Sequence, residues 1–291
     1  MRVLVLFLRY GTEKYGDALN ELDNLYAAQA PDIERHTIII DNSIVKGFIE
    51  EYACDRYLIG GDNSRREFSG WQCALDLMGA ELRKIDAIHF VTSAFRMLYT
   101  DYLDRFSTRI VEVVSRRPTC VGHIDYYPHP VRFDAHVFRH WVRTSFFLVN
   151  PVELMRLRNI VSIQVSEGLF SDDPEWPFAK NRRLSPGYEE LMYNWLASDK
   201  GTGQGTSWHS RLDPSQDCDR LEFQQKALSI LNEHLLSVRL RAQGTNVVDI
   251  TYLAELIERN SGLLVQFPNW TEQLRRRGIP GHSDIGNLPV R

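Results

Sequence analysis

Short apolar runs, each followed by polar residues and then by an amphipathic stretch, recur through the first 127 positions of this chain. Residues 2–8 are continuously apolar apart from their first position, which is typical of a parallel strand buried on both faces. Further strands are expected within residues 37–40, 56–63, 86–95 and 119–127. Apolar residues at helical spacing predict helices over residues 17–29 and 67–82. This alternation predicts an α/β fold, with an open, mostly parallel sheet flanked by helices.

Polar side chains follow each of the first four predicted strands. They are Arg9 and Tyr10, then Asp41, Asn42 and Ser43, then Asp62 and Asn63, and finally Thr92 and Ser93. The loop after the third strand adds Arg66 and Glu67. In open α/β sheets, ligands bind at the carboxyl ends of the strands. Because a packed core has no use for such a group, the sequence predicts a site for a charged, hydroxyl-rich ligand.

The pattern changes after residue 127. Residues 133–157 are aromatic and mixed in charge, and residues 169–187 form a proline-rich loop. Apolar residues three and four apart predict a long helix over residues 219–242 and another over residues 249–258. Residues 278–291 are expected to form a loose tail, so the C-terminal region is predicted to be helical.

Composition and missing motifs argue against several functional classes. The net charge of −4 leaves no general excess of Lys and Arg for binding nucleic acid. Four widely spaced cysteines with no C-x-x-C pair favour a reduced, cytosolic protein. The first apolar run is too short for a signal peptide, and no stretch is long enough for a membrane span. The G-x-G-x-x-G turn, the Walker phosphate loop and the G-x-S-x-G elbow are absent, which argues against dinucleotide enzymes and serine hydrolases.

Four segments together resemble a known family. They are "IIIDNS" at 38–43, "GGDNSRREFSGWQCAL" at 60–75, "VGHIDYY" at 121–127 and "HVFRHWVRTSFFLVN" at 136–150. Their order and spacing resemble GT-A type glycosyltransferases, and more closely the rhamnan-synthesis family of bacterial polysaccharide glycosyltransferases. The resemblance covers residues 1–197. It implies a nucleotide-sugar-binding half at 1–127 and an acceptor-side half of the same domain at 128–215, followed by C-terminal helices and a tail at 216–291.

The resemblance assigns the polar strand ends to a nucleotide-sugar donor. Asp41 would accept hydrogen bonds from a base or ribose, unless it only closes an Asx turn. Asn63 would hold ribose or diphosphate, and Arg66 would fork onto diphosphate oxygens, with a turn residue and a solvated arginine as the alternatives. Glu67 would contact the ligand or be a first-turn acid favoured by the helix dipole. The full predicted binding set is Arg9, Tyr10, Asp41, Asn42, Ser43, Asp62, Asn63, Arg66, Glu67, Thr92, Ser93 and His123.

The segment "VTSAF" at 91–95 departs from the family's pattern. Metal-using members have a D-x-D-like step here, whose carboxylates hold a divalent ion on the diphosphate, and this segment has no carboxylate. Transfer without a metal is one interpretation. The other is a non-catalytic sugar-nucleotide or glycan-binding subunit of a polysaccharide synthase complex. No metal ligand is assigned, and Mg²⁺ or Mn²⁺ is left open as a cofactor. His136 and His140 are expected to share a helix face, without a third ligand.

An inverting transfer needs a carboxylate base within reach of the acceptor hydroxyl. Glu189, in "SPGYEELM", matches the position at which the resembled family carries a glutamate. Its alternative is an ordinary acid in the first turn of a helix. Asp125, which lies between His123 and Tyr126, is the second candidate, and its carboxylate is suited to hydrogen-bonding with acceptor hydroxyls.

The expected activity is transfer of a sugar from a nucleoside diphosphate donor to a bacterial polysaccharide, such as O-antigen, or to a lipid-linked glycan. The chemistry would be inverting and metal-independent, with electrostatic stabilisation of the leaving diphosphate as the main contribution of the protein. The partners would be the donor and the glycan acceptor, and no nucleic acid. The expected location is cytoplasmic. The basic residues 275–277 would allow peripheral contact with the inner face of the membrane, or would simply end a helix.

Overall fold

The computed structural model describes residues 1–97, 100–173, 176–181, 183–197, 212–259 and 266–277. Within these ranges, no helix combines the length and the apolar character that a membrane crossing requires. The predicted tail at residues 278–291 lies outside the described residues.

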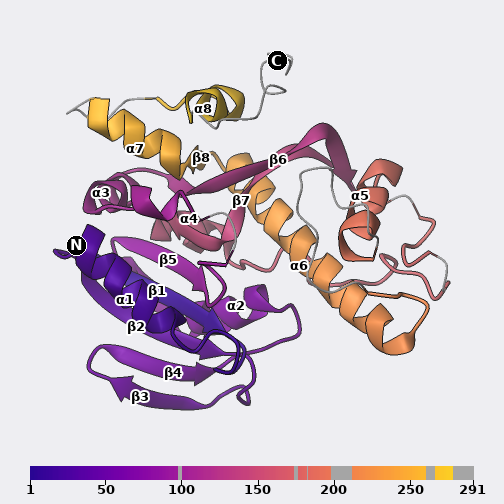
Figure 1. Ribbon diagram of the computed structural model, residues 1–291, viewed down its shortest axis with the longest axis horizontal. Coiled ribbons are helices and arrows are strands. Elements are labelled where there is room, and N and C mark those ends of the chain that lie inside the picture. The colour runs from indigo at the N-terminus through magenta and orange to yellow at the C-terminus, as the bar shows by residue number, and fades with distance from the viewer. Residues whose placement is uncertain (98–99, 174–175, 182, 198–211, 260–265, 278–291) are drawn as a thin grey trace.

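An eight-stranded mixed sheet forms the centre of the fold, in the order β3-β4-β2-β1-β5-β7-β6-β8 (Figure 1). Its strands are β1 (Arg2–Arg9), β2 (Glu34–Asp41), β3 (Ile49–Ala53), β4 (Arg56–Gly60), β5 (Ala87–Thr92), β6 (Thr119–Phe133), β7 (His136–Val149) and β8 (Asn246–Asp249). The strands β4, β2, β1 and β5 are mutually parallel, whereas β3 and β7 are antiparallel to their neighbours β4 and β5. The predicted α/β fold with an open, mostly parallel sheet flanked by helices is therefore confirmed.

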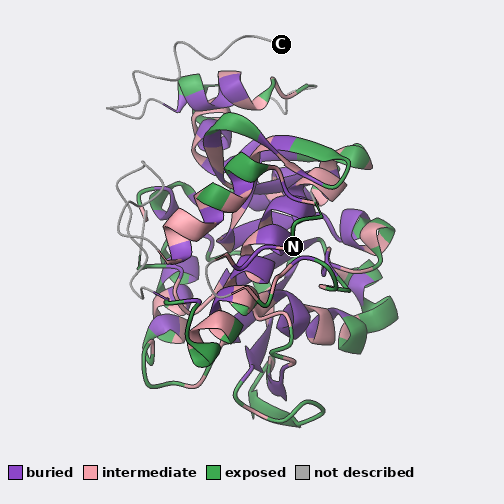
Figure 2. Ribbon diagram, turned by 90° about the vertical axis from the view of Figure 1, so that its right-hand side faces the viewer, coloured by how far each residue is buried: buried purple, intermediate pink, exposed green. Residues whose placement is uncertain are grey.

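Alternate residues of β1 enter two different apolar layers. Val3, Val5 and Phe7 pack with α1 (Ala18–Gln29), α3 (Thr108–Arg116) and α7 (Ile250–Arg259). Leu4 and Leu6 pack on the other face with α2 (Glu67–Met78), α4 (Pro151–Leu157), the last turns of α6 (Asp217–Ala242) and α8 (Trp270–Arg276). Both faces of the central strands are thus buried, while the edge strand β3 is exposed along its whole length (Figure 2).

A third apolar cluster lies beyond the sheet's centre. It joins the far ends of β6 and β7 to α5 (Pro186–Leu196) and to the first half of α6. Helix α6 has 26 residues and extends about 39 Å at 1.5 Å per residue, so it reaches from this cluster back to the sheet (Figure 1). One side of α6 therefore faces the carboxyl ends of the parallel strands.

Several details differ from the sequence expectations. The segment with His136 and His140 is the strand β7 and not a helix, because it pairs over most of its length with β6. The His140 ring stacks on Trp270, with ring centroids 4.6 Å apart. The helix expected over residues 67–82 ends at Met78 and continues as the 3-10 helix η1 (Gly79–Lys84), and a second 3-10 helix, η2 (Leu103–Arg105), precedes α3. The strands β3 and β8 were not expected from their short, separate segments.

Candidate functional site

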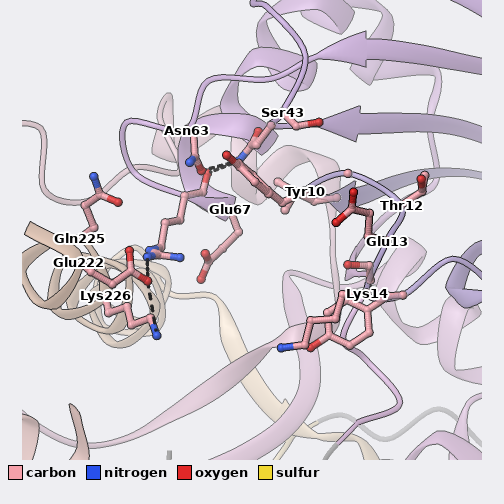
Figure 3. Close-up of a pocket in the computed structure, with 16 residues that line it drawn as sticks. Tyr10, Thr12, Glu13, Lys14, Ser43, Asn63, Glu67, Glu222, Gln225 and Lys226 are labelled. Atoms are coloured by element: carbon pink, nitrogen blue, oxygen red, sulfur yellow. Dashed lines mark hydrogen bonds and ion pairs between the residues drawn. The ribbon is translucent and has the colours of Figure 1, made fainter. Parts of the chain in front are cut away.

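A cavity of about 1050 Å³ lies at the carboxyl ends of β1, β2, β4 and β5, and α6 forms its opposite wall (Figure 3). The residues that line it are Leu8, Tyr10, Gly11, Thr12, Glu13, Lys14, Tyr15, Asn42, Ser43, Asn63, Arg66, Glu67, Ser93, Glu222, Gln225 and Lys226. Four strand ends and one helix therefore bring polar side chains from distant parts of the chain to one hollow.

The cavity contains seven of the side chains that the sequence predicted for binding. These are Tyr10, Asn42, Ser43, Asn63, Arg66, Glu67 and Ser93. Arg9, Asp41, Asp62, Thr92 and His123 are not among its lining residues, and neither are the predicted bases Asp125 and Glu189. Residues 11–15 after β1 and the α6 residues 222, 225 and 226 also line the cavity and were not predicted from the sequence. The first group directly follows a predicted strand, so its place at the carboxyl edge of the sheet could have been predicted. The second group lies within a helix, and no local sequence pattern indicates that it faces the cavity.

Asp41 does not line the cavity but holds two loops that do. Its carboxylate accepts hydrogen bonds from Arg9 Nε (2.8 Å), Gly11 N (3.0 Å), Ser43 N (2.9 Å) and Ser43 Oγ (2.6 Å). Burial alone would raise the pKa of Asp41, but these hydrogen bonds together hold it below the usual range. The geometry is that of the Asx turn, with both carboxylate oxygens occupied by protein groups. Asp41 thereby fixes the loops that carry Tyr10 and Ser43.

Asn42 positions the loop that begins α2. Its Nδ2 donates to the carbonyl oxygen of Arg66 (2.9 Å) and to Asn63 Oδ1 (3.3 Å). The amide fits only because Gly61 and Gly70 lack side chains: a Cβ on either would lie 2.0 Å or 2.5 Å from Asn42 Oδ1. The space that the Asn42 side chain needs explains why glycine stands at positions 61 and 70.

Arg66 stands at the start of α2 in a left-handed backbone conformation, with φ of 51°. Such a conformation costs about 1–3 kcal/mol in a non-glycine residue and is concentrated at functional sites. The Nη2 atom of Arg66 lies 2.7 Å from Glu222 Oε1, which also lies 3.4 Å from Lys226 Nζ (Figure 3). Arg66 Nε is buried and has no hydrogen-bond partner among the described residues. Arg66 is therefore held at the cavity with unused hydrogen-bonding capacity.

Glu67 is the first residue of α2 and faces α6. It accepts a hydrogen bond from Ser229 Oγ (2.5 Å). Burial raises the pKa of Glu67, and the Ser229 hydrogen bond opposes this only in part. Glu67 is therefore not simply an exposed acid in the first turn of a helix, because its side chain both lines the cavity and bonds to the middle of α6.

Four of the remaining predicted side chains, those of Asp62, His123, Asp125 and Glu189, have protein partners outside the cavity. Asp62 pairs with Lys46 (3.2 Å), and Glu189 accepts from Trp176 Nε1 (3.3 Å). Asp125 accepts two hydrogen bonds from Arg143 (2.6 and 3.0 Å) and lies 3.4 Å from His123 Nε2. Burial would raise the pKa of Asp125, but the Arg143 and His123 contacts keep it far below the usual range. Neither Asp125 nor Glu189 is among the residues that line the cavity.

Another carboxylate on α6, Glu233, had no predicted role. Its Oε1 accepts from Thr144 N (2.7 Å) and Thr144 Oγ1 (2.9 Å). Burial raises the pKa of Glu233 to about 7, with the Thr144 hydrogen bonds opposing the shift and nearby Glu67 and Asp125 adding to it. Sequence reasoning missed it because it lies inside an ordinary amphipathic helix.

Among the described residues, no group of three or more His, Cys, Asp or Glu side chains is arranged to hold a metal ion. The sequence matches no protein-family model, and it matches no curated protein.

Proposed function

We propose that this protein is a GT-A type glycosyltransferase that uses a nucleoside diphosphate sugar as its donor. The observation that carries the proposal is the cavity at the carboxyl ends of β1, β2, β4 and β5, which is lined by three cationic side chains and by amide and hydroxyl groups. The cationic residues are Lys14, Arg66 and Lys226. A diphosphate offers acceptor oxygens to such cations, while ribose and sugar hydroxyls suit Asn63, Ser43 and Ser93.

The topology supports a ligand at this place. From β1 the chain proceeds through β2 and β4 on one side, and then returns to β5 on the other side of β1. The carboxyl ends of β1 and β5 are therefore the point at which the strand order reverses, where open α/β sheets bind ligands. Leu8 lies near the carboxyl end of β1, Tyr10 follows β1 and Ser93 follows β5, and all three line the cavity.

The reaction would be displacement at the anomeric carbon, with the nucleoside diphosphate as leaving group. Lys14, Arg66 and Lys226 would stabilise the charge that develops on the diphosphate, the kind of preorganised electrostatic effect that accounts for much of catalysis. Three carboxylates line the cavity, those of Glu13, Glu67 and Glu222, and two of them are engaged by protein groups. Glu222 is paired with Arg66 and Lys226, and Glu67 is bonded to Ser229 with a raised pKa. The proposal therefore includes no step through a metal.

The resemblance to polysaccharide glycosyltransferases extends the proposal to the acceptor. A bacterial polysaccharide or a lipid-linked glycan, assembled at the cytoplasmic face of the membrane, is the proposed acceptor class. This part of the proposal depends on the resemblance and not on the cavity's chemistry.

A thermal-shift screen tests the donor class. UDP, dTDP, GDP and CDP, and a sugar ester of each, are added to the full chain, because a ligand that binds only the folded state raises the melting temperature. We expect at least one to stabilise the protein, and the shift to shrink in Lys14→Ala but not in Lys84→Ala, a change at a lysine outside the cavity that pairs with Glu81. Failure of all four nucleotides to shift the melting temperature would contradict the proposal.

A second assay separates an enzyme from a binding subunit. The donor that binds is incubated with the protein, and release of its nucleoside diphosphate is followed with and without added Mg²⁺ or Mn²⁺. Release above the rate of a protein-free control supports a transferase. Binding without any release would instead favour the non-catalytic subunit of a synthase complex.

A further inference from the structure

A group of polar side chains continues from the cavity along α6 toward β6 and β7. Glu222, Lys226, Ser229 and Glu233 follow one another at spacings of four, three and four residues, so they share one face of the helix. The first two line the cavity, and Ser229 donates to Glu67, which also lines it. Glu233 is one helical turn beyond Ser229, and it is therefore the next side chain along this face.

Glu233 has one oxygen engaged and one available. Both hydrogen bonds from Thr144 go to Oε1. Its Oε2 has no hydrogen-bond partner among the described residues and is not among the buried polar atoms that lack one. The side chain as a whole is half-buried. The carboxylate is thus oriented by β7 at one oxygen, with the other open to solvent or to a ligand.

A second polar atom near Glu233 lacks a partner. Tyr127 is only 3 % exposed, and its hydroxyl makes no hydrogen bond to the described residues. The Tyr127 ring lies with its centroid 5.5 Å from that of His234, the residue after Glu233 on α6. Burial raises the pKa of Tyr127, and the negative charges of Glu233 and Asp125 raise it further. A buried hydroxyl without a partner is costly unless a ligand or water supplies one. The Tyr127 hydroxyl is therefore a second, independent sign of a binding position here.

The groups that interact electrostatically with Glu233 come from every element packed around it. They are Glu67 of α2, Tyr102 before η2, Asp125 and Tyr127 of β6, Arg143 of β7 and Tyr188 of α5. Asp125 and Arg143 neutralise each other as an ion pair. Glu67 then leaves Glu233 in a carboxylate-rich setting, where it holds a proton more readily than an exposed glutamate does.

We propose that Glu233 is the general base of the transfer, taking the proton from the acceptor hydroxyl, and that the Tyr127 hydroxyl helps to bind the acceptor. This inference rests on the proposed glycosyltransferase function and names a residue for its chemical step. The acceptor's O–H bond breaks, with its proton passing to Glu233 Oε2, and the acceptor oxygen forms a bond to the anomeric carbon. The bond from that carbon to the diphosphate oxygen breaks, and its electron pair leaves with the nucleoside diphosphate. Water regenerates the carboxylate by removing the proton afterwards.

The two carboxylates favoured by the sequence are less suited to this step. Asp125 is held by Arg143 and His123, and its strongly lowered pKa makes it a poor proton acceptor. Glu189 lies on α5, where it accepts a hydrogen bond from Trp176, and it does not line the cavity. Glu233 does not line the cavity either, but it has an available oxygen, a pKa raised to about 7 and a link to the cavity through Ser229, on the same side of α6, and Glu67.

The experiment uses UDP-glucose, dTDP-glucose, GDP-mannose and CDP-glucose as probes, with water as the acceptor, and takes the one that binds and is hydrolysed. In Glu233→Gln we expect kcat for nucleoside diphosphate release to fall by about 10²–10⁴-fold. The Kd of the corresponding nucleoside diphosphate should be unchanged. Glu255→Gln, on α7 outside the cavity, is the matched control and should keep the wild-type kcat.

A second variant gives a readout that a structural role would not move. The wild-type kcat should rise with pH through about 7, as Glu233 ionises. Thr144→Val removes the Oγ1 hydrogen bond that favours the ionised form, so the same rise should shift to higher pH while its plateau remains. Glu233→Gln should show no rise at all.

The outcomes separate this inference from the proposed function. Turnover by Glu233→Gln at the wild-type rate, or an unshifted pH profile in Thr144→Val, overturns the inference and leaves the glycosyltransferase proposal standing. If Glu189→Gln loses turnover and Glu233→Gln does not, the base is Glu189. If none of the probes binds or is hydrolysed, both proposals fall together.

Discussion

The strand-end side of the cavity and the face between β6, β7 and α6 are both polar, but they differ in how their side chains are held. On the strand-end side, Asn42 donates to the carbonyl oxygen of Arg66, 24 positions along the chain, and the Asp41 carboxylate accepts from Ser43, two positions along. On the other face, the contact of Glu233 with Thr144 joins residues 89 positions apart in the sequence. The first region is made by the loops that follow adjacent parallel strands. The second forms only when α6 packs on the β6–β7 hairpin.

The difference separates two kinds of site residue. The carboxyl ends of parallel strands lie at one edge of the sheet, so the cationic and amide side chains that follow these strands lie close together. Carboxylates with altered proton affinity need burial and neighbours, which only the tertiary structure supplies. If the comparison is right, substitutions in the first region should change nucleotide affinity, and those in the second should change stability or proton transfer.

The largest effect on stability is expected from Asp125→Asn. This change removes the charge that accepts two hydrogen bonds from the half-buried Arg143 guanidinium, at 2.6 and 3.0 Å, and breaking such an ion pair costs about 3 kcal/mol. Urea denaturation would measure the loss. Asp62→Asn is the control from the strand-end side, where the partner Lys46 is exposed, and should cause no measurable loss. Equal losses in the two variants would mean that the regions do not differ as described.

On the strand-end side, Arg66→Ala should weaken nucleoside diphosphate binding by about ten- to hundredfold. A charge-assisted hydrogen bond contributes about 1.5–3 kcal/mol, and Arg66 has an unpartnered Nε at the cavity. Isothermal titration calorimetry would give the Kd. Arg65→Ala is the neighbouring control: its side chain donates to the carbonyl oxygens of Ile163 (3.3 Å) and Gln164 (3.0 Å), so it should lower stability more than affinity. The reverse pattern would assign the binding role to Arg65.

The sequence predicted the strand-end region well for a physical reason. Continuous apolar runs identify buried parallel strands, and the residues after them, such as Asn63 and Ser93, must then lie at one edge. It could not predict the α6 contribution, because Lys226 and Glu233 look like ordinary polar positions of an amphipathic helix. Nor could it foresee β7, whose strand state depends on pairing with β6. Glu189 was chosen by resemblance alone, and its absence from the cavity depends on where α5 packs, which no local pattern encodes.

The pH dependence of stability sharpens the comparison. The pKa of Glu233 is raised by burial from 4.5 to about 7, so between these values the folded protein retains a proton that the unfolded chain has lost. The free energy of unfolding should therefore decrease as pH rises through this window and stay lower above it. Allowing for partial access to solvent, the decrease is about 1–2 kcal/mol. Urea titrations of wild type and Glu233→Gln from pH 4 to pH 8 measure it, and parallel curves for the two proteins would contradict the assignment.

The smallest expected effect is a gain of affinity in Glu222→Gln. In the structure without ligand, Glu222 pairs with both Arg66 and Lys226, so a diphosphate must compete with it for these two cations. Pairs as exposed as these contribute up to about 1 kcal/mol, so removing the charge should tighten nucleoside diphosphate binding by up to about fivefold. The gain should vanish when Arg66→Ala is present as well, because the competition then loses its main target. A gain that persists in the double variant would show that the Glu222 charge repels the diphosphate across the cavity and does not act through its ion pair with Arg66. A loss of affinity in Glu222→Gln would show instead that its carboxylate contacts the ligand, which would move the donor toward α6 and away from the strand ends.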